Sequence, residues 1–231
     1  MTLRAIIFDV DGTLAETEEA HRAAFNRAFA EAGLDWHWTK DDYGRLLKTT
    51  GGKERMRRHR DEIGATGPTA DEIASLHRRK TEIYGEILSS GELALRTGVA
   101  ELIDAARAAG IRVAVATTTN LPNVEALCRA CWQRPAAEVF DVVAAGDEVA
   151  AKKPAPDVFL LALERLGLGA EACIAVEDSA NGVRSALAAR LAVVVTPSAY
   201  TRDDDFTGAT WVVPELRRET LPDCLLFGPA K

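Results

Sequence analysis

Short apolar runs recur along the chain, and they do not alternate apolar with polar residues. Runs of this kind predict strands that are buried on both faces, as in a parallel sheet. We predict such strands at residues 5–8, 113–116, 140–143, 174–176 and 193–195. Residues 211–213 lie in a less regular stretch and predict a last strand at the edge of the sheet.

Helical patterns separate most of these runs. Residues 99–109 repeat apolar positions at helical spacing and stop at Gly110, and residues 156–166 stop in the same way at Gly167. Residues 179–189 open with a serine, which is a good residue for the N-terminal cap of a helix. The regular succession of strand and helix predicts an α/β fold with a doubly wound parallel sheet.

Residues 17–95 break this succession, because they contain no convincing apolar strand. Four amphipathic stretches in this part predict helices at residues 18–32, 40–47, 53–63 and 70–88. We therefore expect a helical cap domain at 17–95, inserted after the first strand. The core domain would then comprise residues 1–16 and 96–231, with hinges near 15–17 and 94–98.

The composition is that of an ordinary soluble domain and narrows the range of partners. Of the 231 residues, 47% are hydrophobic and 27% charged, and the net charge is −7. An acidic chain is a poor candidate for nucleic-acid binding, which depends on neutralising phosphates. No apolar stretch approaches the ~20 residues of a membrane span, and the first apolar run is too short for a signal peptide. We expect a cytoplasmic monomer that binds neither nucleic acid nor membranes.

Polar residues follow four of the predicted strands. Ligands bind at the carboxyl ends of the strands in open α/β sheets, so these residues are expected to meet at one edge. They comprise Asp9, Asp11, Gly12 and Thr13, then Thr117 to Thr119, then Lys152 and Lys153, and finally Glu177 and Asp178.

This set of side chains suits the transfer of a phosphoryl group from a monoester. One of two neighbouring carboxylates can attack phosphorus while the other handles the proton of the leaving oxygen. Mg²⁺ binds oxygen ligands and relieves the repulsion between carboxylates and a dianionic phosphate, and Asp9, Glu177 and Asp178 are candidate ligands. A lysine can neutralise the phosphate oxygens in the transition state, and a threonine hydroxyl can bind the same oxygens. Lys153 and Lys152 are the alternatives for the lysine, and Pro154 favours Lys153.

Asp9-Val10-Asp11-Gly12-Thr13 resembles the DxDGT motif of the haloacid dehalogenase superfamily. Thr117, Lys153 and the pair Glu177-Asp178 resemble its second, third and fourth motifs, in order and at the expected spacing. The resemblance implies that Asp9 is the nucleophile and Asp11 the general acid and base. It also implies that Mg²⁺ is held by Asp9, the backbone carbonyl of Asp11 and Asp178, with Glu177 as a ligand directly or through water.

Four further segments look like those of the CbbY-type phosphatases within this superfamily. They are Ala15 to Glu19, Thr49 to Arg55, Ala116 to Thr119, and Tyr200 to Arg202. This resemblance implies hydrolysis of xylulose 1,5-bisphosphate, a Rubisco inhibitor, to xylulose 5-phosphate, an activity associated with the Calvin cycle. The helical insertion resembles the cap of the group that contains β-phosphoglucomutase.

The cap offers a second anion site on independent grounds. Gly51 and Gly52 precede a helix whose first turns carry Lys53 and several arginines, and glycines there let backbone N–H groups approach a phosphate. By the resemblance, the distal phosphate contacts Gly51, Gly52, Lys53 and Arg45. Glu18, His21 and Tyr43 would face the sugar, and Thr118 and Thr119 would complete the substrate-binding residues.

Three other functions fit this fold. A phosphoglucomutase-like isomerase uses the same aspartyl chemistry but returns the phosphate to the sugar, so product analysis distinguishes it. A haloacid dehalogenase needs no metal and normally lacks the second acid, so Asp11 and the pair Glu177-Asp178 argue against it. A non-catalytic sugar-phosphate sensor predicts a broken motif, whereas all four motifs are intact.

Overall fold

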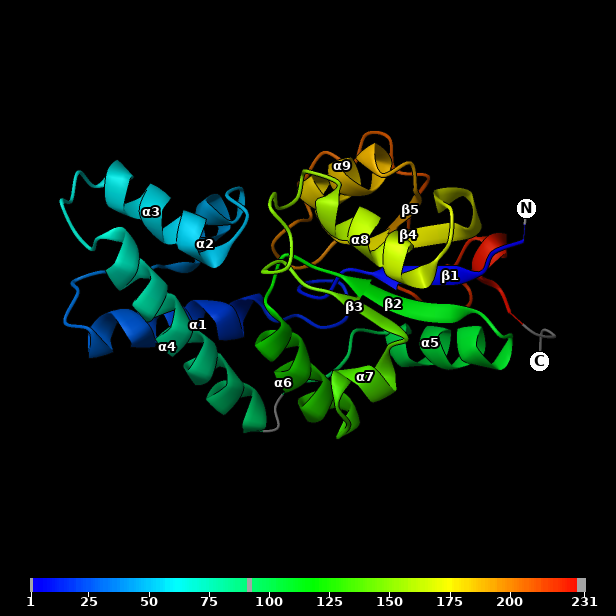
Figure 1. The fold of residues 1–231 in the computed structure, drawn as a ribbon, viewed down its shortest axis with the longest axis horizontal. Helices are drawn as coiled ribbons and strands as arrows, with labels where there is room; N and C mark the ends of the chain where they lie inside the picture. Colours follow the sequence, from blue (N-terminus) through cyan, green and yellow to red (C-terminus); the bar gives the residue numbers. More distant parts are fainter. Residues whose placement is uncertain (1, 91–92, 228–231) are drawn as a thin grey trace.

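The computed structural model describes residues 2–90 and 93–227, and its centre is a six-stranded parallel sheet (Figure 1). The spatial order is β3-β2-β1-β4-β5-β6, and every neighbouring pair is parallel. The predicted doubly wound α/β sheet is therefore confirmed. The strands are β1 (Ala5–Phe8), β2 (Arg112–Ala116), β3 (Val142–Ala144), β4 (Cys173–Glu177), β5 (Ala192–Val195) and β6 (Trp211–Val212).

Helices cover both faces of the sheet (Figure 1). One face packs against α5 (Val99–Ala108), α6 (Leu121–Trp132) and α7 (Ala136–Val139), and the other against α8 (Asp157–Leu166) and α9 (Ala180–Ala188). Two single turns of 3₁₀-helix, Ala170–Ala172 and Asp223–Leu225, complete the elements of this part.

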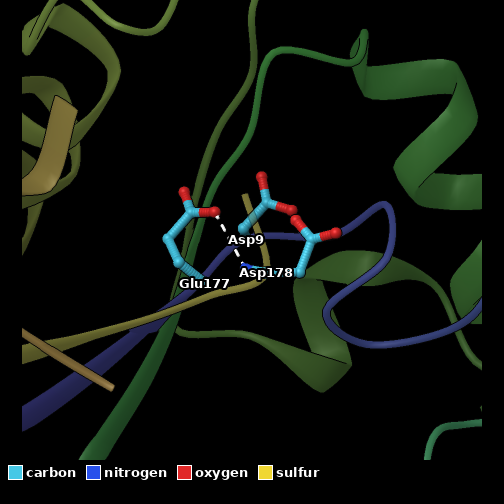
Figure 2. Close-up of side chains that lie close together, drawn as sticks. All are labelled: Asp9, Glu177 and Asp178. Carbon is cyan, nitrogen blue, oxygen red and sulfur yellow. Dashed lines mark hydrogen bonds between the residues drawn. The ribbon is translucent and has the colours of Figure 1, made fainter. Parts of the chain in front are cut away.

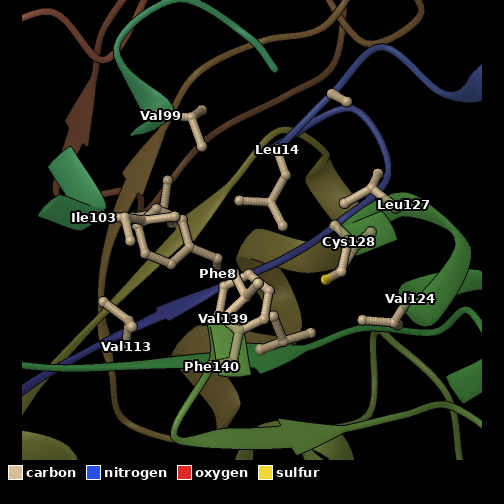
Figure 3. Close-up of a cluster of buried hydrophobic side chains, with 14 of the residues drawn as sticks. Phe8, Leu14, Val99, Ile103, Val113, Val124, Leu127, Cys128, Val139 and Phe140 are labelled. Carbon is tan, nitrogen blue, oxygen red and sulfur yellow. The ribbon is translucent and has the colours of Figure 1, made fainter. Parts of the chain in front are cut away.

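The apolar run of β1 is buried on both faces because it is the central strand. Ile6 and Phe8 point into the cluster formed with α5, α6 and α7, which Figure 3 shows around Phe8. Ala5 and Ile7 point into the cluster formed with α8 and α9. β1 runs parallel to its neighbours β2 and β4, and its carboxyl end places Asp9 at the edge of the sheet.

The strand predicted at residues 140–143 begins two residues later than expected. The short helix α7 ends at Val139, and Phe140 packs its ring against Trp132 at a centroid distance of 5.8 Å. The Asp141 carboxylate then accepts a hydrogen bond of 2.8 Å from the backbone N–H of Val113. Phe140 and Asp141 therefore end the connection from α7, and only the residues from Val142 pair as β3.

The helices α1 to α4, which follow β1 in the chain, lie together at one end of the sheet (Figure 1). Their own apolar cluster contains Trp36 and Trp38, packed between α1, α2, α3 and α4. The segments that lead into α1 and out of α4 lie side by side near the predicted hinges, because Ala15 and Leu95 form an isolated antiparallel bridge. The helices are α1 (Glu18–Glu31), α2 (Lys40–Leu47), α3 (Gly52–Glu62) and α4 (Ala70–Ser89).

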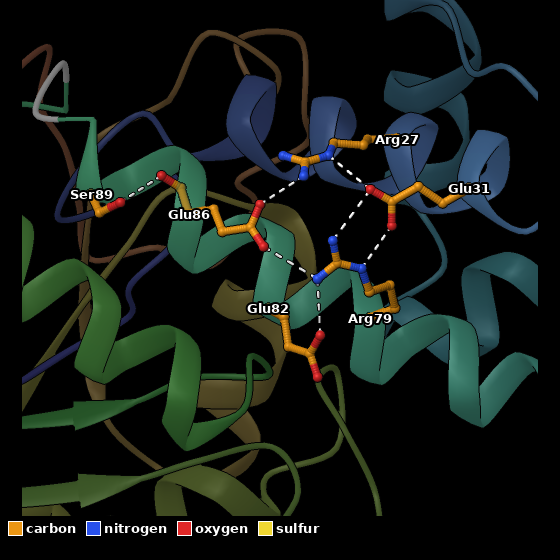
Figure 4. A network of polar contacts seen from close by, with 6 residues as sticks. All are labelled: Arg27, Glu31, Arg79, Glu82, Glu86 and Ser89. Atoms are coloured by element: carbon orange, nitrogen blue, oxygen red, sulfur yellow. Dashed lines mark hydrogen bonds and ion pairs between the residues drawn. The ribbon is translucent and has the colours of Figure 1, made fainter.

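Charged side chains join α1 to α4 on the outer surface of these helices (Figure 4). Arg79 lies 2.7 Å from Glu31, 3.0 Å from Glu82 and 3.2 Å from Glu86. Exposed ion pairs of this kind are individually worth ~0.2–1 kcal/mol, so the apolar contacts beneath them carry more of the packing energy. No helix in the described part of the chain combines the length and the apolar character needed to cross a membrane.

Candidate active site

A cavity of about 950 Å³ lies where the carboxyl ends of the central strands meet helices α1 to α4. The core side of the cavity contributes Asp9, Asp11, Thr118, Thr119, Lys152, Lys153 and Asp178. The helical insertion contributes Glu18, His21, Gly51, Gly52, Lys53, Glu54, Arg55 and Lys80. Residues that are far apart in sequence are therefore brought together at the edge that the strand directions predict.

Three buried carboxylates form the centre of this site (Figure 2). One oxygen from each of Asp9, Glu177 and Asp178 lies within 4.8 Å of the others. Burial raises the pKa of Asp9 to about 8, although Lys153 opposes the shift. Burial and the neighbouring carboxylates Asp9 and Glu177 also raise the pKa of Asp178 well above its usual range.

These carboxylates fit a divalent metal ion. The repulsion among them shows that the site holds more negative charge than its own side chains balance, and a hard cation with oxygen ligands would balance it. Gly12 allows their close approach: it has φ of +83°, and a Cβ atom there would overlap Oδ2 of Asp178. The cluster is the expected one, formed by Asp9, Glu177 and Asp178.

Lys153 lies between two of the carboxylates. Its ammonium group donates hydrogen bonds of 2.6 Å to Asp9, 2.6 Å to Glu177 and 2.8 Å to the backbone carbonyl of Ala116. Burial lowers the pKa of Lys153, but the charges of Asp9 and Glu177 outweigh it and hold that pKa above the usual range. Lys152 points toward helix α3, where it contacts Glu54, so it is Lys153 that contacts Asp9.

The carboxylate of Asp11 faces helix α1 and not the acidic cluster. Its Oδ1 accepts hydrogen bonds of 2.6 Å from Thr17 and 2.9 Å from Nε2 of His21. Burial works against ionisation, but His21 and Thr17 lower the pKa of Asp11 to about 2. The two aspartates of the first motif thus have opposite pKa shifts because their neighbours differ: burial and carboxylates surround Asp9, whereas hydrogen-bond donors face Asp11.

Lys80 continues this line of hydrogen bonds and was not predicted from the sequence. Its Nζ lies 2.6 Å from Nδ1 of His21, and the His21 ring stacks on Tyr84 with centroids 4.0 Å apart. Because the ionised Asp11 can only accept, the proton of His21 is assigned to Nε2, and Nδ1 then accepts a hydrogen bond from Lys80. Burial lowers the pKa of Lys80 to about 7. The ammonium also lies 4.8 Å from the Phe25 ring centre.

The predicted sugar-facing residues occupy two layers. Glu18 lines the cavity, as does His21. Tyr43 lies behind Glu18, where its hydroxyl donates a 2.7 Å hydrogen bond to that carboxylate and accepts one of 3.0 Å from Arg55. Tyr43 therefore orients Glu18 in this structure and is itself buried.

The predicted distal-phosphate residues do not all reach the cavity. Gly51, Gly52 and Lys53 line it. The structure does not bring Arg45 there: its guanidinium pairs with Glu62 on the surface between α2 and α3, and 45% of the side chain is exposed. This pairing depends on how α2 and α3 pack, which no local sequence pattern reveals.

The three threonines after β2 differ in depth. Thr118 and Thr119 line the cavity, whereas Thr117 is buried beneath them and accepts a hydrogen bond of 3.2 Å from the N–H of Thr119. Asn123, which sequence reasoning missed, donates a hydrogen bond of 2.7 Å to the Thr119 hydroxyl. An asparagine in the first turn of a helix predicts capping as readily as binding, so the sequence carried no distinct signal for it.

Residues 3–190 match the family of haloacid dehalogenase-like hydrolases, so the chain belongs to this family. The parallel sheet brings Asp9, Lys153, Glu177 and Asp178 together at one edge. The predicted superfamily and the predicted class of enzyme, a phosphatase of this family, are therefore confirmed.

Among its relatives, the chain is 60% identical to Protein CbbY of Rhodobacter capsulatus over 94% of its length and 95% of that protein. It is 56% identical to Protein CbbY of Cereibacter sphaeroides over 90% of both chains. A crystal structure of CbbY from Rhodobacter sphaeroides in complex with phosphate has a TM-score of 0.89 at 53% identity, covering 93% of this chain and 95% of that one. A crystal structure of a variant of that protein in complex with xylulose 1,5-bisphosphate has a TM-score of 0.88 at 52% identity, with the same coverage.

Proposed function

We propose that the protein is a Mg²⁺-dependent phosphatase that hydrolyses xylulose 1,5-bisphosphate to xylulose 5-phosphate and phosphate. The observation that carries the proposal is the contact of 2.6 Å between Asp9 and Lys153 at the floor of a cavity that the helical insertion closes. The similarity to CbbY, including the variant crystallised with xylulose 1,5-bisphosphate, supports this choice of substrate.

The reaction proceeds in two displacements on phosphorus. Asp11 takes up a proton from solvent as the substrate binds. An oxygen of Asp9 attacks the 1-phosphate, the bond between phosphorus and the sugar oxygen breaks, and Asp11 gives this proton to the leaving oxygen. Water then attacks the phosphoryl group on Asp9, Asp11 takes a proton from this water, and the bond between Asp9 and phosphorus breaks to free phosphate. Asp11 releases its proton to solvent as the phosphate leaves, so both aspartates return to their starting states.

The environment of Asp11 suits its two tasks. Without substrate, the hydrogen bonds from Thr17 and His21 hold it as a carboxylate. A dianionic phosphate placed beside it raises the pKa of Asp11, because like charges disfavour ionisation, and so favours the protonated form needed in the first step. Once the sugar has left, the same hydrogen bonds again favour the carboxylate that accepts a proton from water.

The other groups balance charge on the phosphoryl oxygens. Lys153 offers its ammonium beside Asp9, and Thr118 and Thr119 line the cavity with hydroxyl and backbone N–H groups. We assign the hydroxyl of Thr117, which lies beneath them, to the same phosphoryl oxygens. Asp9, the backbone carbonyl of Asp11 and Asp178 would hold Mg²⁺, with Glu177 binding it directly or through water. A bound Mg²⁺ relieves the repulsion between the phosphate and these carboxylates.

The helical insertion selects the substrate. We assign residues 17–95 to a cap domain and residues 1–16 and 96–231 to the catalytic core. Residues 91 and 92 of the cap, and residues 1 and 228–231 of the core, lie outside the described part. Gly51, Gly52 and Lys53 hold the distal phosphate, and Glu18 and His21 face the sugar. We further propose that the enzyme acts as a cytoplasmic monomer that removes an inhibitor of Rubisco in support of the Calvin cycle.

Phosphorus NMR of a reaction with xylulose 1,5-bisphosphate tests the proposal. We expect inorganic phosphate and xylulose 5-phosphate to appear in equal amounts, and only when Mg²⁺ is present. Phosphate release from other sugars alone would leave the mechanism and remove the substrate. Movement of phosphate between sugar positions, without release, would identify a mutase instead.

A further inference from the structure

Helix α3 presents its N-terminus to the cap side of the cavity. The residue before its first turn, Gly51, has no side chain that could accept hydrogen bonds from the first N–H groups of the helix. Such groups and the helix dipole favour an anion at this position. Gly51, Gly52 and Lys53 all line the cavity here.

A carboxylate of the protein itself already lies at this position. Oε2 of Glu54 lies 3.2 Å from Nζ of Lys152, and a Cβ atom built on Gly51 would overlap both side chains. Burial opposes its ionisation, but the Glu54 backbone N–H and Lys152 lower the pKa of this carboxyl group. A charged carboxylate therefore occupies the helix terminus, and Gly51 makes room for it.

Lysines from both parts of the molecule line the cavity here. Lys152 belongs to the loop after β3 in the core, whereas Lys53 belongs to α3 in the cap. Within residues 2–90 and 93–227, no carboxylate lies within 4.0 Å of the Lys53 ammonium. The Glu54 carboxylate thus faces Lys152, Arg57 at 3.5 Å and a helix N-terminus, and Lys53 lines the same cavity. Together these groups can balance a more highly charged anion than Glu54.

We propose that Glu54 is an internal substitute for the distal phosphate of the substrate, and that this phosphate displaces it from Lys152 and the start of α3. Lys152 is then a further substrate-binding residue, and Glu54 sets the affinity for the second phosphate. The proposal rests on the proposed function, because it needs a substrate with two phosphates.

The proposal predicts opposite effects for the two partners of one ion pair. Glu54 competes with a second phosphate, so its neutralisation strengthens the binding of a bisphosphate. Lys152 binds that phosphate, so its removal weakens the binding of a bisphosphate. If the pair served only to hold the cap against the core, loss of either partner would weaken binding in the same direction.

The experiment measures equilibrium binding in the Asp9→Asn background, where no phosphoryl transfer occurs. Calorimetry with Mg²⁺ compares xylulose 1,5-bisphosphate with xylulose 1-phosphate, which lacks the distal group. Glu54→Gln is expected to tighten bisphosphate binding by about fivefold, the scale of one partly screened charge. Lys152→Met is expected to weaken it by about tenfold, the scale of a hydrogen bond to a charged group. In both variants the affinity for the monophosphate changes less.

Glu62→Gln is the matched control, because it makes the same substitution and charge change on the same helix. Glu62 pairs with Arg45 and Arg58 outside the cavity, so the affinities for both ligands should stay the same. Thermal unfolding of each variant checks that the cap is still folded.

The possible outcomes separate the two proposals. If the Asp9→Asn protein binds the bisphosphate, but adding Glu54→Gln leaves this affinity unchanged or lowers it, the displacement proposal is wrong while the proposed function survives. If the Asp9→Asn protein binds neither ligand, the proposed substrate is wrong, and the displacement proposal fails with it.

Discussion

Replacing Lys80 with methionine gives a sharp test of the buried charges beneath the cavity. Only 3% of Lys80 is exposed, and its ammonium contacts His21, Phe25 and Tyr84. Burial lowers the pKa of Lys80 from 10.5 to about 7. Methionine keeps the length and apolar contacts of the side chain but removes its titration.

The sign of the effect follows from proton binding. Between pH 7 and pH 10.5 the unfolded chain holds a proton on Lys80 more firmly than the folded protein does. The contribution of Lys80 to the free energy of unfolding therefore increases as the pH rises across this window. The same contribution decreases as the pH falls toward 7. At ~1.36 kcal/mol per pKa unit, the full shift corresponds to about 5 kcal/mol, and two pH units within the window to about 2–3 kcal/mol.

Urea unfolding at about pH 7 and about pH 9 measures this contribution when the wild type and Lys80→Met are compared. The wild type should gain about 2–3 kcal/mol relative to the variant at the higher pH. The comparison cancels groups that both proteins share, including the acidic cluster. Lys40→Met is the control, because 71% of the Lys40 side chain is exposed, and it should show no such difference. Equal pH dependence of the wild type and Lys80→Met would refute the assignment of a buried, titrating lysine.

Three other predictions follow from the site. Lys53→Ala should raise the KM for xylulose 1,5-bisphosphate by about tenfold and affect p-nitrophenyl phosphate far less, and equal losses in steady-state assays would remove its distal-phosphate role. Gly12→Ala should cost about 1–3 kcal/mol of stability and most of the activity, because φ is +83° there and the new Cβ would overlap Asp178. Retention of full kcat in that variant would contradict the close packing. Chelation with EDTA should abolish turnover and lower the Tm, and Mg²⁺ should restore both, because a cation bound at ~100 times its Kd stabilises a fold by about 2.7 kcal/mol. A Tm that is the same with EDTA and with excess Mg²⁺ would argue against a metal at the acidic cluster.

Much of the core was predictable because one physical rule links its parts. Apolar runs identified the buried strands, and the parallel direction of those strands placed Asp9, Lys153 and Glu177 at one edge. Phe140 and Asp141 were assigned to the strand because the residue types alone do not reveal their tertiary contacts. The Phe140 ring packs on Trp132, and the Asp141 carboxylate accepts a hydrogen bond from the Val113 N–H.

The cap was less predictable because its side-chain directions depend on tertiary packing. Arg45 pairs with Glu62, and Lys152 pairs with Glu54, across large separations in sequence. Lys80 did leave a signal, because it falls at helical spacing among the buried residues of α4. A lysine is normally assigned to an exposed face, and only the His21 ring beside it explains why this one is buried.

The most direct test of the central claim is to trap the phosphoryl group on Asp9. Rapid acid quenching of the enzyme mixed with Mg²⁺ and xylulose 1,5-bisphosphate, labelled at the 1-phosphate, should give labelled protein, with the label in the peptide that contains Asp9. The Asp9→Asn variant should remain folded, carry no label and release no phosphate. Full phosphate release by Asp9→Asn, or turnover of the wild type with label on no residue or on another one, would contradict the account.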